Sequence, residues 1–189
     1  MEMTTQYLGL TLRCPLMAGA SPLVNELSMV RRLEDAGAGA IVMHSLFEEQ
    51  IIDEQMATYS ATEPPKENYA EAQSYLPEPE EFTLGPDSYL EEVRRIKEAV
   101  GVPVIGSLNG NTRGGWLKYA RLIADAGADA LELNVYDLPA DAEEDAASIE
   151  RRIVELVGEV RRTIDIPLAV KLAPFYTAMS NLAVRLRDA

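Results

Sequence analysis

Apolar residues in this chain gather in two alternating kinds of run. Short, nearly continuous apolar runs predict strands, and longer runs with an apolar residue every three or four positions predict helices. We predict strands at residues 15–20, 40–46, 102–109, 130–135 and 166–173, and helices at 25–36, 86–100, 115–126, 148–164 and 177–189. The strands do not alternate with polar residues, which is typical of strands covered on both faces in a parallel sheet.

Two kinds of turn lead from helix to strand. Before the second and fourth strands the sequence reads Ala-Gly-Ala, where Gly37 and Gly127 are able to take the left-handed conformation that ends a helix. Before the other strands stands a proline: Pro15, Pro103 or Pro167. This odd–even rhythm favours a closed parallel (β/α) barrel, in which alternate strands feed alternate layers of the core. A doubly wound open sheet is the alternative.

The rhythm predicts an incomplete barrel. The chain ends on "RLRDA", the start of a third Asp-Ala turn, whereas such a barrel has eight strands and typically ~250 residues. We therefore expect one partial TIM-barrel domain over residues 1–189, with about five of eight βα units; a natural short paralogue is the alternative. Residues 48–85, rich in Pro and Glu, break the rhythm and are either a lid over the rim or a solvated insertion.

Composition narrows the class of protein. No apolar run approaches the ~20 residues of a membrane span, and the acidic, polar N-terminus differs from a signal peptide, so we expect a cytoplasmic protein. The net charge of −14 argues against nucleic-acid and anionic-membrane partners. One cysteine, Cys14, excludes an internal disulfide, and one histidine, His44, excludes a His-rich metal site, so no metal is expected.

Polar residues follow or end each predicted strand, and a parallel barrel brings these ends to one rim. Lys171 is the sharpest signal, because it lies within the apolar run "LAVKLAP". An ammonium group there carries a desolvation cost, so we expect it to have an anionic partner or a ligand. The two interpretations are a ligand or catalytic contact, and an ion pair with Glu132 inside the barrel.

The runs "CPLMAGASP", "HSLFEEQ", "IGSLNG", "DALELNV" and "PLAVKLAPF" follow one another in this order. In these runs the chain resembles the class 1 dihydroorotate dehydrogenases and their close dihydroorotate dehydrogenase-like relatives. The resemblance implies a TIM barrel that holds FMN over its C-terminal rim. It also implies hydride transfer from a dihydropyrimidine-like CH–CH group to the flavin, in pyrimidine biosynthesis or a related reaction, with a small-molecule substrate and a homo-oligomer in the full-length form.

The resemblance implies a cofactor-binding role for seven residues of this chain: Ala20, Ser21, His44, Ser45, Asn109, Asn134 and Lys171. Ala20 and Ser21 match backbone that passes under the flavin ring. Lys171 matches a lysine on the pyrimidine side of the flavin, where a fixed cation stabilises the charge that develops on hydride transfer, and so it is also a catalytic candidate. Asn134 and Tyr136 are the expected substrate contacts.

The chain departs from the family at three points. His44 stands where the family has a lysine, and the family's Asn-Ser-Met-Gly run after the second strand is missing. The family's catalytic Cys or Ser matches Asp137, which is either a general base or a residue that caps the loop. These departures leave two alternatives open: a barrel lyase or isomerase that uses Lys171, and a non-catalytic paralogue. We expect the 189-residue chain alone to be inactive.

Overall fold

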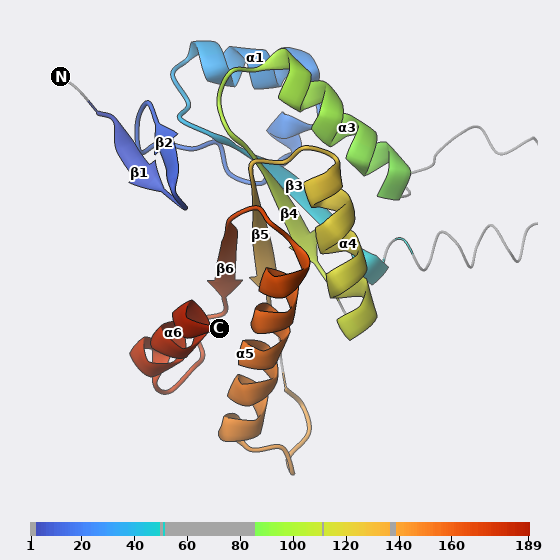
Figure 1. The fold of residues 1–189 in the computed structure, drawn as a ribbon, viewed down its shortest axis with the longest axis vertical. Helices are drawn as coiled ribbons and strands as arrows, with labels where there is room; N and C mark the ends of the chain where they lie inside the picture. Colours follow the sequence, from blue (N-terminus) through green and yellow to red (C-terminus); the bar gives the residue numbers. More distant parts are fainter. Residues whose placement is uncertain (1–2, 50, 52–85, 111, 137–138) are drawn as a thin grey trace, which may run out of the picture.

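The computed structural model describes residues 3–49, 51, 86–110, 112–136 and 139–189 (Figure 1). Its centre is a parallel sheet of β3 (Ile41–Phe47), β4 (Val104–Asn109), β5 (Ala130–Val135) and β6 (Leu168–Leu172). The helices are α1 (Leu27–Asp35), α3 (Pro86–Ala99), α4 (Arg113–Asp125), α5 (Ala146–Thr163) and α6 (Met179–Asp188), with a 3₁₀ turn at Pro22–Val24. None of the helices in these residues is long and apolar enough to cross a lipid bilayer.

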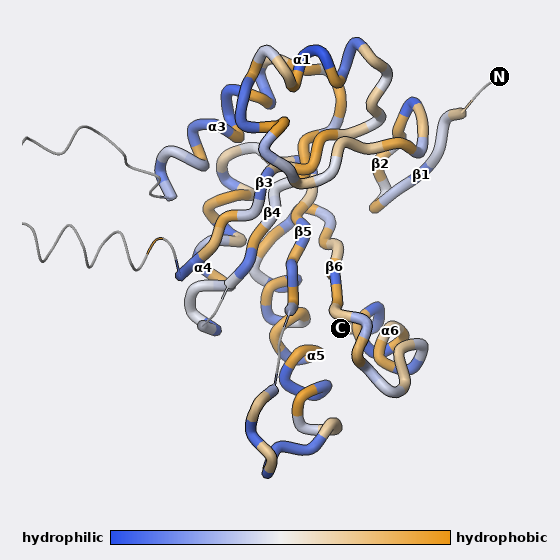
Figure 2. The backbone as a smooth tube through the Cα atoms, turned by 180° about the vertical axis from the view of Figure 1, so that it is seen from behind, coloured by the Kyte–Doolittle hydropathy of each residue, from blue (hydrophilic) through white to orange (hydrophobic). Residues whose placement is uncertain are grey.

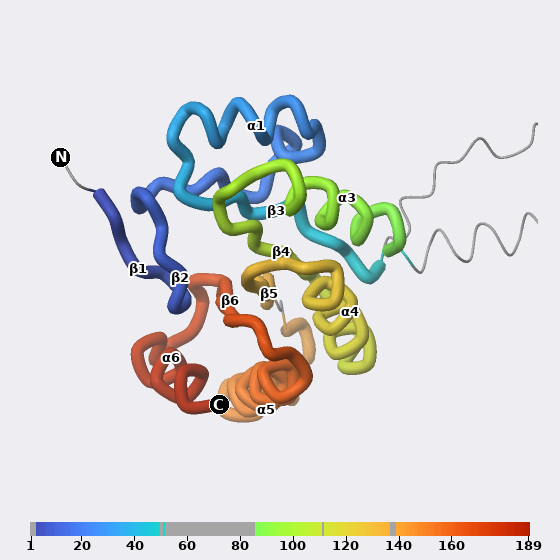
Figure 3. Tube along the Cα trace, turned by 45° about the horizontal axis from the view of Figure 1, so that its top comes forward, coloured from blue at the N-terminus to red at the C-terminus, as the bar shows by residue number. Residues whose placement is uncertain are grey.

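The order of the strands identifies the architecture. Neighbours in the sheet are neighbours in the chain, β3-β4-β5-β6, and every pair is parallel. A doubly wound sheet reverses its strand order at one point and carries helices on both faces, whereas here the helices lie on one side of the sheet (Figure 3). The described strands therefore form an incomplete (β/α) barrel, as the sequence predicts.

The apolar strands bury both faces, although against different partners. On the helix side, one large cluster joins Ile41, Leu108 and Leu131 to the apolar stripes of the helices. On the concave side, a small cluster of Ala40, Val42, Leu12, Ile105 and Ala130 fills the N-terminal end. Figure 2 shows hydrophilic colour interrupting the apolar strands further along, clearly so in β5 and β6.

Leu12 belongs to a hairpin that the sequence analysis does not predict. Strands β1 (Thr5–Tyr7) and β2 (Leu10–Leu12) pair antiparallel on the side of the sheet away from the helices (Figures 1 and 3). Leu8 and Gly9 turn the chain, both with positive φ, 53° and 76°. Two three-residue strands are too short to give a periodic pattern, which explains why they escape prediction.

The two predicted kinds of turn are confirmed before the four strands of the sheet, but Pro15 opens no regular strand. Gly37 and Gly127 follow α1 and α4 with φ of 101° and 96°, the left-handed conformation that glycine adopts without a steric cost. Pro103 and Pro167 stand directly before β4 and β6, and their carbonyls accept hydrogen bonds of 2.9 Å from Ile41 and Leu131. Proline at these positions leaves the acceptor in place and removes no ladder donor that the sheet needs.

The first predicted strand, over residues 15–20, is much shorter than expected. It makes one parallel bridge, Ala18 to Ile41, with Ala18 N–H donating to Ala40 at 3.0 Å and Val42 N–H donating to Ala18 at 2.8 Å. Pro22, which begins the 3₁₀ turn, ends the extended segment soon after the bridge. The segment lies where a first barrel strand belongs. The predicted lid over 48–85 falls outside the described residues except for 48, 49 and 51.

We predict that the isolated chain self-associates. Along β6, all five residues are only partly buried, and no strand of the described part of the chain pairs with its outer edge. An unpaired strand edge recruits other strands. Light scattering over a concentration series is expected to give a mass above the 20.8 kDa of one chain. Phe175→Ser, which removes the 80% exposed aromatic side chain beyond this edge, is the control and leaves the mass unchanged. A monodisperse monomer at all concentrations contradicts the prediction.

Candidate functional site

Strand register collects the polar side chains on the concave face. In the sheet, Ser45 pairs with Ser107, and Ser107 pairs with Glu132. Two residues further along β5, Asn134 pairs with Lys171. Residues in register on parallel strands point to the same face, and residues two apart on a strand do so as well. Ile105 and Ala130 of the concave cluster precede Ser107 and Glu132 by two. The polar residues therefore continue the concave face beyond its apolar end.

Asn134 is the centre of a buried hydrogen-bond cluster. Its Nδ2 donates to Ser45 Oγ at 2.8 Å and to Ser107 Oγ at 2.9 Å, and the two hydroxyls lie 2.8 Å apart. Asn134 is 3% exposed and Ser107 is fully buried. The side-chain carbonyl oxygen of Asn134, Oδ1, is buried and has no hydrogen-bond partner among the described residues. A buried acceptor left unpaired costs about 1–3 kcal/mol, and native proteins usually fill such a place with a ligand or a water.

Lys171 has the anionic partner that the sequence analysis offers as one interpretation. Its Nζ donates to Glu132 Oε1 at 2.7 Å. The lysine side chain is 42% exposed and the glutamate 18%, so the ammonium group remains accessible to a ligand from the rim. The ion pair does not exclude a ligand contact.

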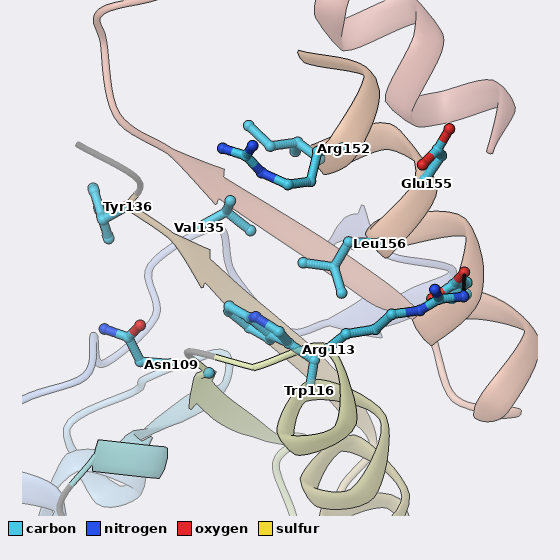
Figure 4. Close-up of a pocket in the computed structure, with 11 residues that line it drawn as sticks. Asn109, Arg113, Trp116, Val135, Tyr136, Arg152, Glu155 and Leu156 are labelled. Atoms are coloured by element: carbon cyan, nitrogen blue, oxygen red, sulfur yellow. Dashed lines mark hydrogen bonds and ion pairs between the residues drawn. The ribbon is translucent and has the colours of Figure 1, made fainter. Parts of the chain in front are cut away.

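Asn109 and Tyr136 lie at the ends of β4 and β5 and line a cavity of about 490 Å³. Trp116, Leu156 and Arg113 form the far side of this cavity, between α4 and α5 (Figure 4). Asn109 follows Ser107 by two residues, so strand alternation places it on the concave face. Asn134 and Lys171, which pair in register, share the concave face at the carboxyl ends of β5 and β6, while Asn109 at the end of β4 also borders the cavity between α4 and α5.

The structure places His44 on the other face. The register jumps from Val42↔Ile105 to Ser45↔Ser107, so β3 advances three residues while β4 advances two. This bulge turns both Met43 and His44 towards the helices. The His44 ring stands edge-on to Tyr89, with ring centres 5.0 Å apart, and its Nδ1 lies 3.8 Å from Glu92 Oε2. The prediction that His44 contacts a cofactor on the concave face is therefore corrected.

Two further predicted residues, Ala20 and Ser21, lie at the edge of the site. Ala20 is exposed and Ser21 partly buried, directly after the bridge that Ala18 makes to β3. Asp137, the predicted base, lies outside the described residues. Cys14 is buried at the opposite end of the sheet, where its Sγ approaches the Gly37 carbonyl at 3.1 Å. Among the residues that are described, no group of three or more His, Cys, Asp or Glu side chains is placed to hold a metal ion.

Two residues that shape the site escape sequence analysis. Tyr89 of α3 binds the backbone of Ser107: its hydroxyl accepts from the N–H at 3.0 Å and donates to the C=O at 3.2 Å. Burial raises the pKa of Tyr89, so the hydroxyl keeps its proton. In a helix pattern, Tyr89 cannot be told from any other core residue.

The second is Glu48, a buried carboxylate that follows β3. It accepts from Thr112 N–H at 2.8 Å and from Thr112 Oγ1 at 2.5 Å, at the N-terminus of α4. Anions are favoured there by the unpaired N–H groups and the helix dipole. The trace that this contact leaves in the sequence is the glycine at position 115, because any larger side chain there would overlap the Glu48 carboxylate.

Comparisons with known proteins agree on a barrel. No protein-family model matches the chain. The catalytic subunit of dihydroorotate dehydrogenase B (NAD(+)) from Thermoplasma acidophilum is 26% identical over 189 residues, which cover 96% of this chain and 58% of that protein. This similarity supports the expected resemblance at the level of the barrel.

Solved structures with the same fold have a different name. Dihydrodipicolinate synthase from Bacillus clausii matches with a TM-score of 0.50 and 18% identity, covering 85% of this chain and 41% of that one. A putative dihydrodipicolinate synthetase from Pseudomonas aeruginosa gives 0.54 and 16%, over 92% and 51%. Such identities show the fold alone. The chain spans about half the length of these proteins.

We predict an unusual titration for His44. Burial lowers the pKa of His44 from its ordinary 6.5 and raises the pKa of Glu92 to about 6. The lowered pKa makes the His44 contribution to the free energy of unfolding fall as the pH drops through 6.5; the raised pKa makes the Glu92 contribution rise as the pH drops through about 6. NMR of this sole histidine is expected to give a midpoint below 6.5.

Glu92→Gln removes an anion beside the ring and is expected to lower the His44 midpoint further. Glu91→Gln, on the exposed side of the same helix, is the matched control. A midpoint at or above 6.5, or equal shifts in the two variants, contradicts this placement of His44.

We also predict opposite effects for two adjacent glycines. Gly115→Ala forces the Glu48 carboxylate from the helix N-terminus and is expected to lower the free energy of unfolding by about 1–3 kcal/mol. Gly114→Ala meets no atom within 4 Å and is expected to be neutral or stabilising by up to about 1 kcal/mol. Urea denaturation measures both. Equal stability of the two variants contradicts the placement of Glu48.

Proposed function

We propose that this chain carries the ring-binding rim of an FMN-dependent oxidoreductase that resembles dihydroorotate dehydrogenase. The reaction is hydride transfer from a dihydropyrimidine-like CH–CH group to the flavin. The observation that carries the proposal is the pairing of Asn134 with Lys171 in register: Asn134 Oδ1 accepts no hydrogen bond within the described residues, and Lys171 Nζ is held by Glu132. The sequence similarity to a dihydroorotate dehydrogenase subunit supports it.

The residues present fit a flavin. Asn134 Oδ1 is a buried acceptor that needs a donor, and Lys171 is a donor with positive charge. The pyrimidine edge of a flavin offers the complement, an N–H beside carbonyl oxygens. When bound, FMN supplies the two-electron acceptor that amino-acid side chains lack.

The chain's own residues divide the work. Ser45 and Ser107 hold the Asn134 amide through its Nδ2, and so fix where its oxygen points. Glu132 holds Lys171 Nζ, so that its charge is in place before negative charge develops, which is how preorganised electrostatics lowers a barrier. We assign Tyr136, which is 55% exposed, to the substrate and propose Asp137 as the base.

A lysine-dependent barrel lyase is the second candidate, and the solved structures favour it over the oxidoreductase. They include synthases of the dihydrodipicolinate type and YagE from E. coli K12, of the same family, in complex with pyruvate (TM-score 0.55, 14% identity, 92% of this chain and 50% of that one). Lys171 would attack a substrate carbonyl. Its contact with Glu132 argues against this role, because Lys171 Nζ is engaged by the carboxylate at 2.7 Å and does not stand free to meet a substrate carbonyl.

The flavin proposal is tested by titrating FMN fluorescence with the chain. Barrel phosphate sites are usually built after strands seven and eight, so we expect weak binding. Lys171→Ala is expected to weaken it by about tenfold, and Lys171→Arg to retain most of it. Lys118→Ala, on the helix side over Tyr119, is the matched control. The absence of flavin binding, or equal loss in the Lys171→Ala and Lys118→Ala variants, overturns the proposal.

The lyase candidate is tested by trapping. The chain is incubated with pyruvate and borohydride, which reduces a lysine imine to a stable secondary amine. Mass spectrometry of the peptide that contains Lys171 then reads the adduct. We expect none, because Glu132 holds the ammonium group. A stoichiometric adduct at Lys171, absent in Lys171→Arg, would establish the second candidate against the first.

A further inference from the structure

The backbone of Ser107 is held from the helix side by a side chain. At this point the bulge in β3 interrupts the regular β3–β4 register. The Tyr89 hydroxyl accepts from Ser107 N–H at 3.0 Å and donates to Ser107 C=O at 3.2 Å. It therefore bonds both backbone groups of this residue, as a neighbouring strand would do. Both residues are buried, Tyr89 at 3% exposed.

The side chain of the same serine works on the opposite face. Ser107 Oγ accepts from Asn134 Nδ2 at 2.9 Å and lies 2.8 Å from Ser45 Oγ. Tyr89 thus fixes the position of a strand residue whose hydroxyl fixes the Asn134 amide. The path runs from α3 to the rim through three hydrogen bonds and one residue of backbone.

We propose that Tyr89 is a positioning residue for the concave site: its hydroxyl sets Ser107 and, through Ser107, the orientation of the Asn134 amide. The inference rests on the proposed function for its meaning, since Asn134 is the residue proposed to meet the ring. The hydrogen bonds from Tyr89 to Ser107 and from Asn134 to Ser107 do not depend on any ligand.

A purely packing role makes a different prediction. The Tyr89 ring lies in the helix-side core together with Tyr119 of α4, which is 5% exposed and for which no contact with Ser107 is found among the described residues. If the ring alone matters, Tyr89→Phe resembles Tyr119→Phe. If the hydroxyl positions Ser107, only Tyr89→Phe disturbs the site, since Ser107 N–H is then left without its partner.

The experiment compares the two variants in ¹⁵N-labelled chain by NMR. In Tyr89→Phe, we expect hydrogen exchange of the Ser107 amide to accelerate roughly ten- to hundredfold relative to Leu131. We also expect the side-chain amide signals of Asn134 to shift. Tyr119→Phe is expected to leave both readouts at their wild-type values. Equal Ser107 exchange and equal Asn134 signals in the two variants overturn the proposal.

Two further readouts keep the test decisive. If Tyr89→Phe fails to fold, the wild-type chain is measured alone: a Ser107 amide protected as well as Leu131 supports the proposal, and rapid exchange overturns it. FMN affinity, where the wild-type chain binds FMN, is expected to fall several-fold in Tyr89→Phe and not in Tyr119→Phe. A chain that binds no FMN defeats the proposed function and leaves the NMR test of Tyr89 intact.

Discussion

The parallel pairing of β3, β4, β5 and β6, in a register that shifts only at the β3 bulge, is the constraint on which the rest of the structure depends. Because residues in register share a face, the same pairing that buries Leu131 against the helices turns Glu132 and Asn134 to the concave side. A shift by one residue would exchange the two sets, placing carboxylate and ammonium groups in the apolar layer. The core therefore selects the register, and the register assembles the site.

Sequence reasoning reaches far into the fold because its signals are local. The left-handed glycines at 37 and 127, the prolines before β4 and β6, and the continuous apolar strands each depend on one residue or one run. The polar residues of the concave face can be expected from their positions at the ends of the predicted strands, without any knowledge of the packing. The hairpin near the N-terminus is missed because its strands are too short to give a pattern.

The remaining errors arise where tertiary contacts decide. His44 is expected among the cofactor contacts because it ends the second predicted strand and matches a lysine of the similar family, and nothing in the run "AIVMHSL" marks the bulge. Tyr89 and Glu48 act across helix–strand junctions, and their partners Ser107 and Thr112 lie 18 and 64 positions away. Such pairs become visible only when the elements are packed together.

The proposed chemistry of the rim depends on the positive charge of Lys171. In the proposed function, Lys171 serves as a fixed positive charge, held by Glu132 at 2.7 Å, for a ring that gains negative charge. Asn134 Oδ1, which accepts no hydrogen bond from the described part of the chain, is a second contact point that the N–H donor of a planar ring would satisfy.

The most direct test uses NMR of the labelled chain to map where lumiflavin, a flavin ring without phosphate, binds. The account predicts shifts at the Asn134 side-chain amide and at the Lys171 ammonium group. Shifts confined to the cavity between α4 and α5, or no shifts, would contradict it.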